Sequence, residues 1–119
     1  MANTLEPTKK ERRTLIEIIK KGNLARYREW LSELDSLIHK PYSEDENEFD
    51  RCMEITKKSR DFFKEAMARE DFYRNTQLLN GAGNLLHEKY IEEKDLDPLS
   101  DEIKNAIIFW ANTIRIEEP

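Results

Sequence analysis

LLNGAGNLLHEKY, residues 78–90, is the stretch of sequence on which the interpretation of the fold depends. Two of the three glycines of the chain, Gly81 and Gly83, stand in it with one residue between them. Such a pair is typical of a loop that cradles a phosphate, of a break between two helices, or of a notch that another element approaches closely. The first interpretation predicts a nucleotide-binding protein, and the other two predict a helical scaffold.

The glycine stretch does not have the pattern of a phosphate-binding loop. A dinucleotide fingerprint is Gly-x-Gly-x-x-Gly after a strand, and the position of its third glycine is held by Leu86. A Walker loop needs lysine and then serine or threonine after its last glycine, but Gly83 is followed by Asn84. The preceding residues have helical spacing, so no strand aims the loop. We therefore predict no cofactor.

Two structural interpretations of the glycines remain open. In the first, Gly81 ends one helix and Asn84 caps the next. In the second, one helix continues and the small residues form a notch for close packing. Leu79, Leu86 and Tyr90 stay in helical phase across the glycines, which favours the second. Two glycines inside a helix cost about 2 kcal/mol relative to alanine, which tertiary packing can offset.

The composition predicts an all-α protein. Of 119 residues, 38% are hydrophobic and 38% are charged, valine is absent, and leucine and isoleucine number 12 and 11. Three glycines and four prolines are too few for the turns of a sheet protein. We expect residues 1–119 to form a single-domain antiparallel helical bundle of four to five helices, with residues 1–7 and 117–119 as frayed ends.

Capping signals divide the N-terminal part into two predicted helices. Thr8 and Glu11 form a capping box that starts the first helix. Gly22 is expected to end that helix, and Asn23 to cap a second one that Pro41 ends. The buried stripe of the first is Leu15, Ile18 and Ile19, and that of the second is Leu24, Tyr27, Leu31, Leu34 and Ile38.

Three further helices are predicted after Pro41. Ser43 and Glu46 form a second capping box, which predicts a helix start at Ser43. Asp71 is expected to cap a fresh helix, and Asp97 or Ser100 to cap the last one, after Pro98. The buried stripe of the helix that starts at Ser43 is expected to be Phe49, Cys52, Met53, Thr56, Phe63, Ala66 and Met67.

Few residues offer the chemistry of an active site or of a metal site. His39 and His87 are the only histidines, and Asp35 shares a helix face with His39 but finds no further ligand in the sequence. His39 lies in the last turn of a predicted helix, where it can serve the free carbonyls. Cys52 is expected to be a small core residue. We predict no catalytic residue and no metal, and an enzyme is the third interpretation of the function.

The charge distribution separates two classes of partner. The net charge is −5, although residues 1–40 alone carry +3. An acidic body disfavours general affinity for nucleic acid and suits a protein partner. The helix-Gly-helix pattern at 14–33 fails as a helix-turn-helix, because Lys21 and Asn23 flank the glycine. The alternative function, a nucleic-acid-binding regulator, would use the basic residues Lys9, Lys10, Arg12, Arg13, Lys20 and Lys21.

The last predicted helix is apolar on two sides. One side carries Leu99, Ile103, Ala106, Ile107, Trp110 and Ile114 and is expected to face the core. A helix with a second apolar side is either covered by another helix or half exposed for a partner. One alternative is therefore cover by an N-terminal helix, and the other is a protein interface, with a homodimer as the expected form. The residues of this second side are Asn105, Ile108, Phe109, Asn112 and Ile116.

The sequence predicts a cytoplasmic protein that acts by binding. No window approaches 18 consecutive apolar residues, and the N-terminus lacks the apolar core of a secretory signal. The single Cys52 agrees with a reducing compartment. We expect a protein-interaction or regulatory module, with homodimerisation as one route, and no membrane partner.

Overall fold

The computed structural model describes residues 6–73 and 77–117, with side chains as far as Ile114, and this part of the chain is all-α. It has no strand in the described ranges, so the predicted fold class is confirmed. Within the described ranges, the 3-10 turns η1 (Asp71–Tyr73) and η3 (Glu93–Leu96) lie between the helices. The helices are α1 (Lys9–His39), α2 (Glu48–Glu70), α3 (Leu78–His87) and α4 (Asp101–Glu117).

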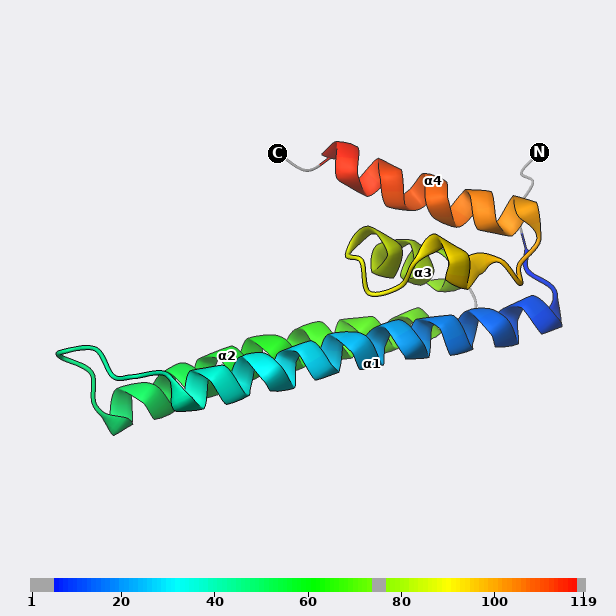
Figure 1. The fold of residues 1–119 in the computed structure, drawn as a ribbon. Coiled ribbons are helices and arrows are strands. Elements are labelled where there is room, and N and C mark those ends of the chain that lie inside the picture. The colour runs from blue at the N-terminus through cyan, green and yellow to red at the C-terminus, as the bar shows by residue number, and fades with distance from the viewer. Residues whose placement is uncertain (1–5, 74–76, 118–119) are drawn as a thin grey trace.

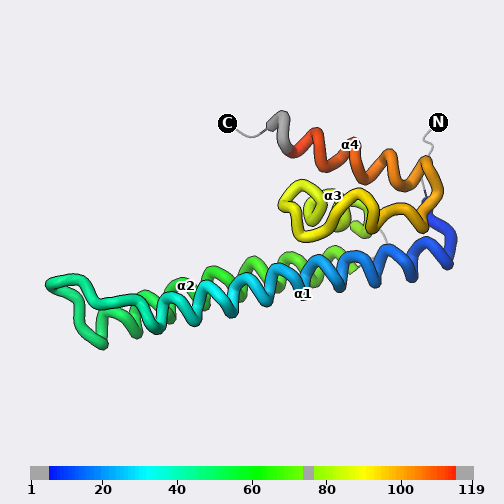
Figure 2. The backbone as a smooth tube through the Cα atoms, in the orientation of Figure 1, coloured from blue at the N-terminus to red at the C-terminus, as the bar shows by residue number. Residues whose placement is uncertain are grey.

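The four helices are arranged in three layers (Figure 1). α1 and α2 form a long antiparallel hairpin, α3 lies on the N-terminal half of α1, and α4 covers α3. The far half of the hairpin extends beyond α3 and α4 (Figure 2). The molecule is therefore elongated, with extents of 61 × 30 × 23 Å. Because the hairpin has no third layer over much of its length, it must expose more surface than a closed bundle does.

α1 is one helix, which corrects the prediction of two. The Thr8–Glu11 capping box is confirmed, with both of its hydrogen bonds at 3.1 Å. Gly22, however, does not have a positive φ and does not end the helix. A Cβ atom there would lie 2.7 Å from Leu85 Cδ1, so the glycine makes room for α3. Asn23 caps nothing; it is buried, and its side-chain amide donates a hydrogen bond to the Tyr73 hydroxyl at 3.1 Å.

The turn of the hairpin is longer than predicted. α1 ends at His39, just before Pro41, as expected. The expected start of a helix at Ser43 is wrong, because α2 begins at Glu48 and is capped by a reciprocal pair of Asn47 and Asp50. The Ser43 amide still donates to Glu46 at 3.1 Å, but within the connecting turn.

Arg51 fastens this end of the hairpin. Its side chain is buried, and its guanidinium donates to the Leu37 carbonyl at 2.8 Å and to Glu46 at 2.9 Å. The bond to Leu37 satisfies a carbonyl at the C-terminal end of α1 that has no partner within the helix. The hydrogen bond from Arg51 is the main reason that the pKa of Glu46 falls to about 2. Glu46 is therefore committed to the turn and is not available to cap a helix.

α2 is rotated about its axis relative to the prediction. The stripe expected to be buried is on the exposed side: Phe49 is 69% exposed and Phe63 is 63% exposed, and Cys52 is exposed as well. The opposite side faces α1, where Phe62 stacks on Trp30 at 4.9 Å. Glu65 accepts a hydrogen bond from Arg26 at 2.8 Å on that same side. An ion pair and aromatic stacking, which apolar spacing does not detect, therefore decide which side of α2 is inside.

The glycine stretch forms α3, a single helix through both glycines, and the notch interpretation is confirmed. A Cβ atom on Gly81 would lie 2.6 Å from Phe72 Cβ, and one on Gly83 would collide with the Trp110 ring. The predicted start at Asp71 is wrong, because Asp71 is the C-cap residue of α2. Residues 74–76 lie outside the described ranges.

The core lies at the open end of the hairpin, where α3 packs between α1 and α4. The segment between α3 and α4 contributes to it, since Ile91 and Leu96 are buried. Ser100 caps α4 as expected, with its Oγ 3.5 Å from the Ile103 amide. The buried residues common to these elements are Leu15, Ile18, Ile19, Leu78, Ala82, Leu85, Ile91, Leu96, Leu99, Ile103 and Ile107.

Candidate functional site

The hairpin presents a row of exposed apolar side chains on each of its helices. In α1 the exposed apolar residues follow one another at intervals of seven residues. In α2 they form two pairs, and the two members of each pair are four residues apart. Monomeric domains rarely expose so many large apolar side chains together. We call this surface the open face, and it consists of Leu24, Leu31 and Ile38 of α1 with Phe49, Met53, Phe63 and Met67 of α2.

The α1 row and Phe63 fall on the same side of the hairpin. Leu31 follows Trp30, and Phe63 follows Phe62, and it is Trp30 and Phe62 that stack between the helices. Each residue turns a helix by about 100°, so the residue after a contact residue lies beside the contact line. Because the two helices are antiparallel, this step leads to the same side in both. The remaining residues of α2 extend the open face around its outer edge.

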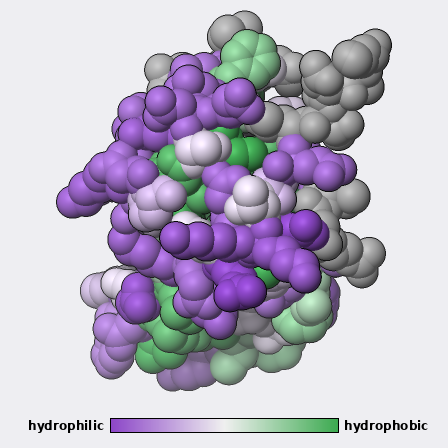
Figure 3. Space-filling view, turned by 90° about the vertical axis from the view of Figure 1, so that its right-hand side faces the viewer, coloured by the Kyte–Doolittle hydropathy of each residue, from purple (hydrophilic) through white to green (hydrophobic). Residues whose placement is uncertain are grey.

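The open face is turned away from α3. A residue that comes just before a contact residue of α1 points to the side opposite the open face. Gly22, which precedes Asn23, lies against Leu85 on that side. Glu29, which precedes Trp30, accepts a hydrogen bond there from Tyr90 at 2.5 Å. Viewed from the end that carries the core, hydrophobic residues gather along the lower margin of the molecule, away from α4 (Figure 3). Nothing in the described part of the chain covers this side.

The open face has the size of a protein interface. On α2 the open face runs from Phe49 to Met67, which gives about 27 Å of length at 1.5 Å per residue, and two packed helices are about 20 Å wide. The resulting area of about 540 Å² is close to the area of about 600 Å² that each partner contributes at the small end of specific complexes. A surface of this extent is large enough to bind another protein specifically.

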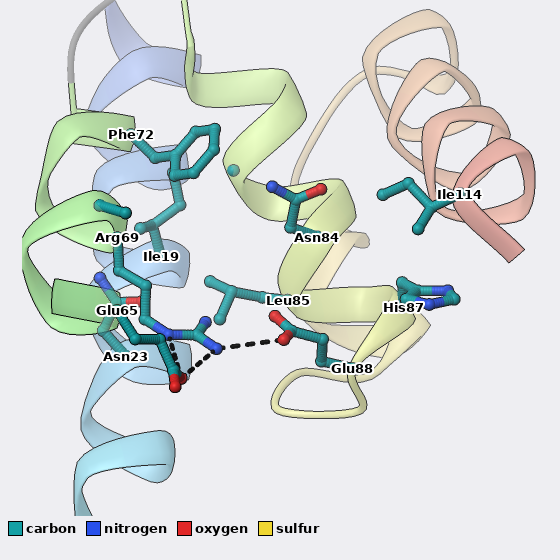
Figure 4. A pocket seen from close by; sticks show the side chains of 12 residues that line it. Ile19, Asn23, Glu65, Arg69, Phe72, Asn84, Leu85, His87, Glu88 and Ile114 are labelled. Atoms are coloured by element: carbon teal, nitrogen blue, oxygen red, sulfur yellow. Dashed lines mark hydrogen bonds and ion pairs between the residues drawn. The ribbon is translucent and has the colours of Figure 1, made fainter. Parts of the chain in front are cut away.

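A pocket lies on the other side, between α1, α2, α3 and the end of α4 (Figure 4). Its volume is about 430 Å³. Ile19, Phe72 and Leu85 form apolar walls, and the buried Asn23 and Arg69 add polar groups. This is the volume range of small-molecule sites.

The charged groups of the pocket are bonded to one another. Arg69 Nη2 lies 2.9 Å from Glu65 and 3.1 Å from Glu88, and Arg26 Nε lies 2.8 Å from Glu65 (Figure 4 shows the Arg69 bonds). The hydrogen bond from Arg26, followed by that from Arg69, lowers the pKa of Glu65. This network joins α1, α2 and α3, and its first role is structural.

Two tyrosines close to this network are held in the protonated form. Burial, followed by the hydrogen bond to Glu70, raises the pKa of Tyr27 to about 12. Burial and the bond to Glu29 raise the pKa of Tyr90 to about 12 as well. At neutral pH both hydroxyls therefore act as hydrogen-bond donors that connect elements, not as proton acceptors.

The predicted interface on α4 is partly exposed. Phe109 is 71% exposed, and Asn105 and Asn112 are exposed, on the outer layer of the molecule. Ile108 differs, because it is half-buried and packs against the core. The side chain of Ile116 lies outside the described residues. The three exposed residues share one side of α4, so this surface remains a second predicted interface.

The basic N-terminal residues are distributed along α1. Lys20 lies 3.8 Å from Glu17, and Lys21 lies 2.6 Å from Asp95, so acidic groups accompany both. Lys9, Lys10 and Arg13 are exposed, whereas Arg12 is half-buried. Of the six predicted nucleic-acid contacts, five are therefore exposed, and two of these five, Lys20 and Lys21, are paired with acidic groups.

The candidate reactive residues occupy different places. Cys52 is exposed on α2, which corrects the prediction that it belongs to the core. His39 is exposed at the end of α1, with its Nδ1 2.9 Å from the Asp35 carbonyl oxygen, where it serves the helix end as expected. His87 lines the pocket. In the described ranges, no group of three His, Cys, Asp or Glu side chains is arranged to hold a metal ion.

Sequence reasoning missed the open face because it assigned both rows to the core. One signal was available: α1 and α2 carry more apolar and aromatic residues than one contact line can bury. Trp30 and Leu37 lie on the contact side of α1, beside the predicted stripe with Leu31 and Ile38. When a helix carries two neighbouring apolar stripes and packs along one of them, the other stripe is left exposed.

Comparison with protein-family models, curated proteins and solved structures finds no match to this chain. Within residues 6–73 and 77–117, no helix has both the length and the apolar character that crossing a bilayer requires.

Proposed function

We propose that this protein is a protein-interaction module and that the open face of the α1–α2 hairpin is its binding surface. The observation that carries the proposal is the exposure of seven large apolar side chains on that face, although the core is complete without them. Burying one such side chain is worth about 1.5–3 kcal/mol, so a partner that covers several gains substantial affinity. The charged pocket ranks behind this surface, because its ionic groups are already bonded to one another.

A capture experiment with matched variants tests the proposal. Phe63→Asp places a charge in the open face, whereas Ser36→Asp places the same charge at an exposed position of α1 that precedes the contact residue Leu37. From an extract of the cell of origin, the wild type and Ser36→Asp are expected to capture a protein that Phe63→Asp loses. Circular dichroism checks that both variants fold. Identical captured proteins for all three would contradict the proposal.

The exposed side of α4 supports a second expected contact, self-association. Phe109 is the most exposed large apolar side chain of the described residues, and its replacement should cost little stability. Light scattering is expected to give the wild type twice the chain mass of 14.2 kDa and Phe109→Asp the mass of one chain. A wild type of 14.2 kDa would contradict dimerisation.

A further inference from the structure

We infer that the partner of the open face is an acidic amphipathic helix of another protein. The inference rests on the proposed function and adds the chemistry of the occupant. The apolar side of two antiparallel helices suits a third helix, whose apolar residues at i, i+3, i+4 and i+7 lie against it. Met53 and Met67 add side chains that adapt to different partners. The charge at the edges of the face decides between the possible occupants.

Cations line the open face. Arg28 is four residues after Leu24, so the two are neighbours on α1. On α2, Lys57 is four residues after Met53, and Arg60 lies between the turns that carry Met53 and Phe63. Lys64 is four residues after Arg60 and continues the row along the outer edge. All four cations are exposed.

These cations have no partner of their own. Among the residues that the structure describes, Arg28, Lys57, Arg60 and Lys64 take part in no ion pair and no side-chain hydrogen bond. Within α1 and α2, three acidic residues lie three or four positions from a residue of the open face: Asp35, Asp50 and Glu70. Asp35 lies 3.4 Å from His39, Asp50 accepts a hydrogen bond from the Asn47 amide, and Glu70 accepts one from the Tyr27 hydroxyl. The stretch of the open face around Leu24 and Phe63 has cations and no acidic residue at these positions, although the chain as a whole carries −5. Carboxylates on a bound helix would complement it.

The same charges argue against the two other occupants. A second copy of this chain would bring one set of cations against another, which costs free energy at an interface. An anionic membrane extends beyond the open face, so it also approaches the exposed acidic residues Glu44 and Asp45 of the turn between α1 and α2, which it repels. A short helix is confined to the open face and meets the local cations, because salt screens charges more distant than about 10 Å.

Peptide binding with charge-matched variants tests the inference. The probes are two labelled synthetic helices of about 20 residues with the same apolar positions, one flanked by glutamate and one by lysine. Fluorescence anisotropy is expected to show the acidic peptide binding at least about tenfold more tightly, with an affinity that falls as salt rises. Arg60→Glu/Lys64→Glu should weaken its binding about tenfold. The control variant Lys9→Glu/Lys10→Glu changes the net charge by the same amount, but at the N-terminal end of α1. It should change the affinity for the acidic peptide by less than about twofold.

Each alternative outcome has a defined meaning. Equal binding of both peptides that Phe63→Asp abolishes would overturn the acidic partner but retain the open face as a binding surface. If neither peptide binds, the helical occupant is wrong, and the capture experiment judges the proposed function separately. Flotation with phosphatidylserine vesicles that Phe63→Asp abolishes would identify a membrane instead. Self-association that Phe63→Asp abolishes and Phe109→Asp does not would identify a second copy.

Discussion

Replacing Gly83 with leucine is expected to lower the free energy of unfolding by about 3 kcal/mol. A Cβ atom at this position would collide with Trp110 Cδ1 and would lie 3.0 Å from Cγ and 3.1 Å from Cβ of the same residue. Rotation of the Trp110 ring cannot relieve the contact with Trp110 Cβ, because that atom is bonded directly to the α4 backbone. α4 would have to move away from α3, and the hydrogen bond of 2.9 Å between Trp110 Nε1 and Asn84 would be strained.

Urea unfolding followed by circular dichroism measures this effect. Ser32→Leu adds the same side chain at an exposed position of α1 and is expected to change stability by less than about 0.5 kcal/mol. The double variant Gly83→Leu/Trp110→Ala should lose less unfolding free energy than the two single variants lose together, because removing the ring makes room for the leucine. A Gly83→Leu protein as stable as the wild type would show that the notch is not required.

Replacing Arg69 with methionine is expected to cost about 2 kcal/mol of stability. The guanidinium is buried between Glu65 and Glu88, and it joins α2 to α3. Removing one member of a buried ionic group leaves the others without a counter-charge, at a cost of about 3–5 kcal/mol when they are fully buried. Here Glu65 keeps its ion pair with Arg26, and both carboxylates keep partial contact with water, with side-chain exposures of 38% and 41%, so we expect less.

The pH dependence of stability provides a second readout for Arg69. The pKa of Glu65 is lower in the folded protein, chiefly through Arg26 and next through Arg69. Its contribution to stability is therefore present above the ordinary pKa of 4.5 and is lost as the pH falls towards the lowered value. Arg69→Met should flatten this acid-side loss in urea unfolding between pH 3 and 6, with Arg69→Lys intermediate. An unchanged pH profile would show that Arg69 and Glu65 are not coupled in solution.

Much of the fold follows from signals that are local in sequence. The Thr8–Glu11 capping box, the end of α1 before Pro41 and the cap at Ser100 all occur where the residues predict them. The two caps depend on hydrogen bonds within one turn of chain, and the helix end depends on the missing amide hydrogen of Pro41, so the residue types and their spacing are sufficient. The same is true of the continuous helix through Gly81 and Gly83, whose apolar neighbours keep helical phase.

The candidate site follows from the sequence far less well. The apolar rows of α1 and α2 were recognisable, but their assignment to the core was wrong, because apolar spacing cannot tell which of two sides faces a neighbour. The pairing of Arg26 with Glu65 and the stacking of Trp30 on Phe62 select the inner side of α2. Those partners come from different helices, so no local pattern contains them.

By itself, the sequence determined that this protein is all-α, where α1 begins and ends, where α4 begins, and that Gly81 and Gly83 lie inside a helix. These properties depend on backbone hydrogen bonds and caps among near neighbours. Only the tertiary structure decided that Gly22 is a notch for Leu85 and that Phe63 faces outward. The first depends on where α3 packs on α1, and the second on which side of α2 pairs with α1. A side chain is buried only where another element reaches it, and α3 and α4 lie on the other side of the hairpin from Phe63.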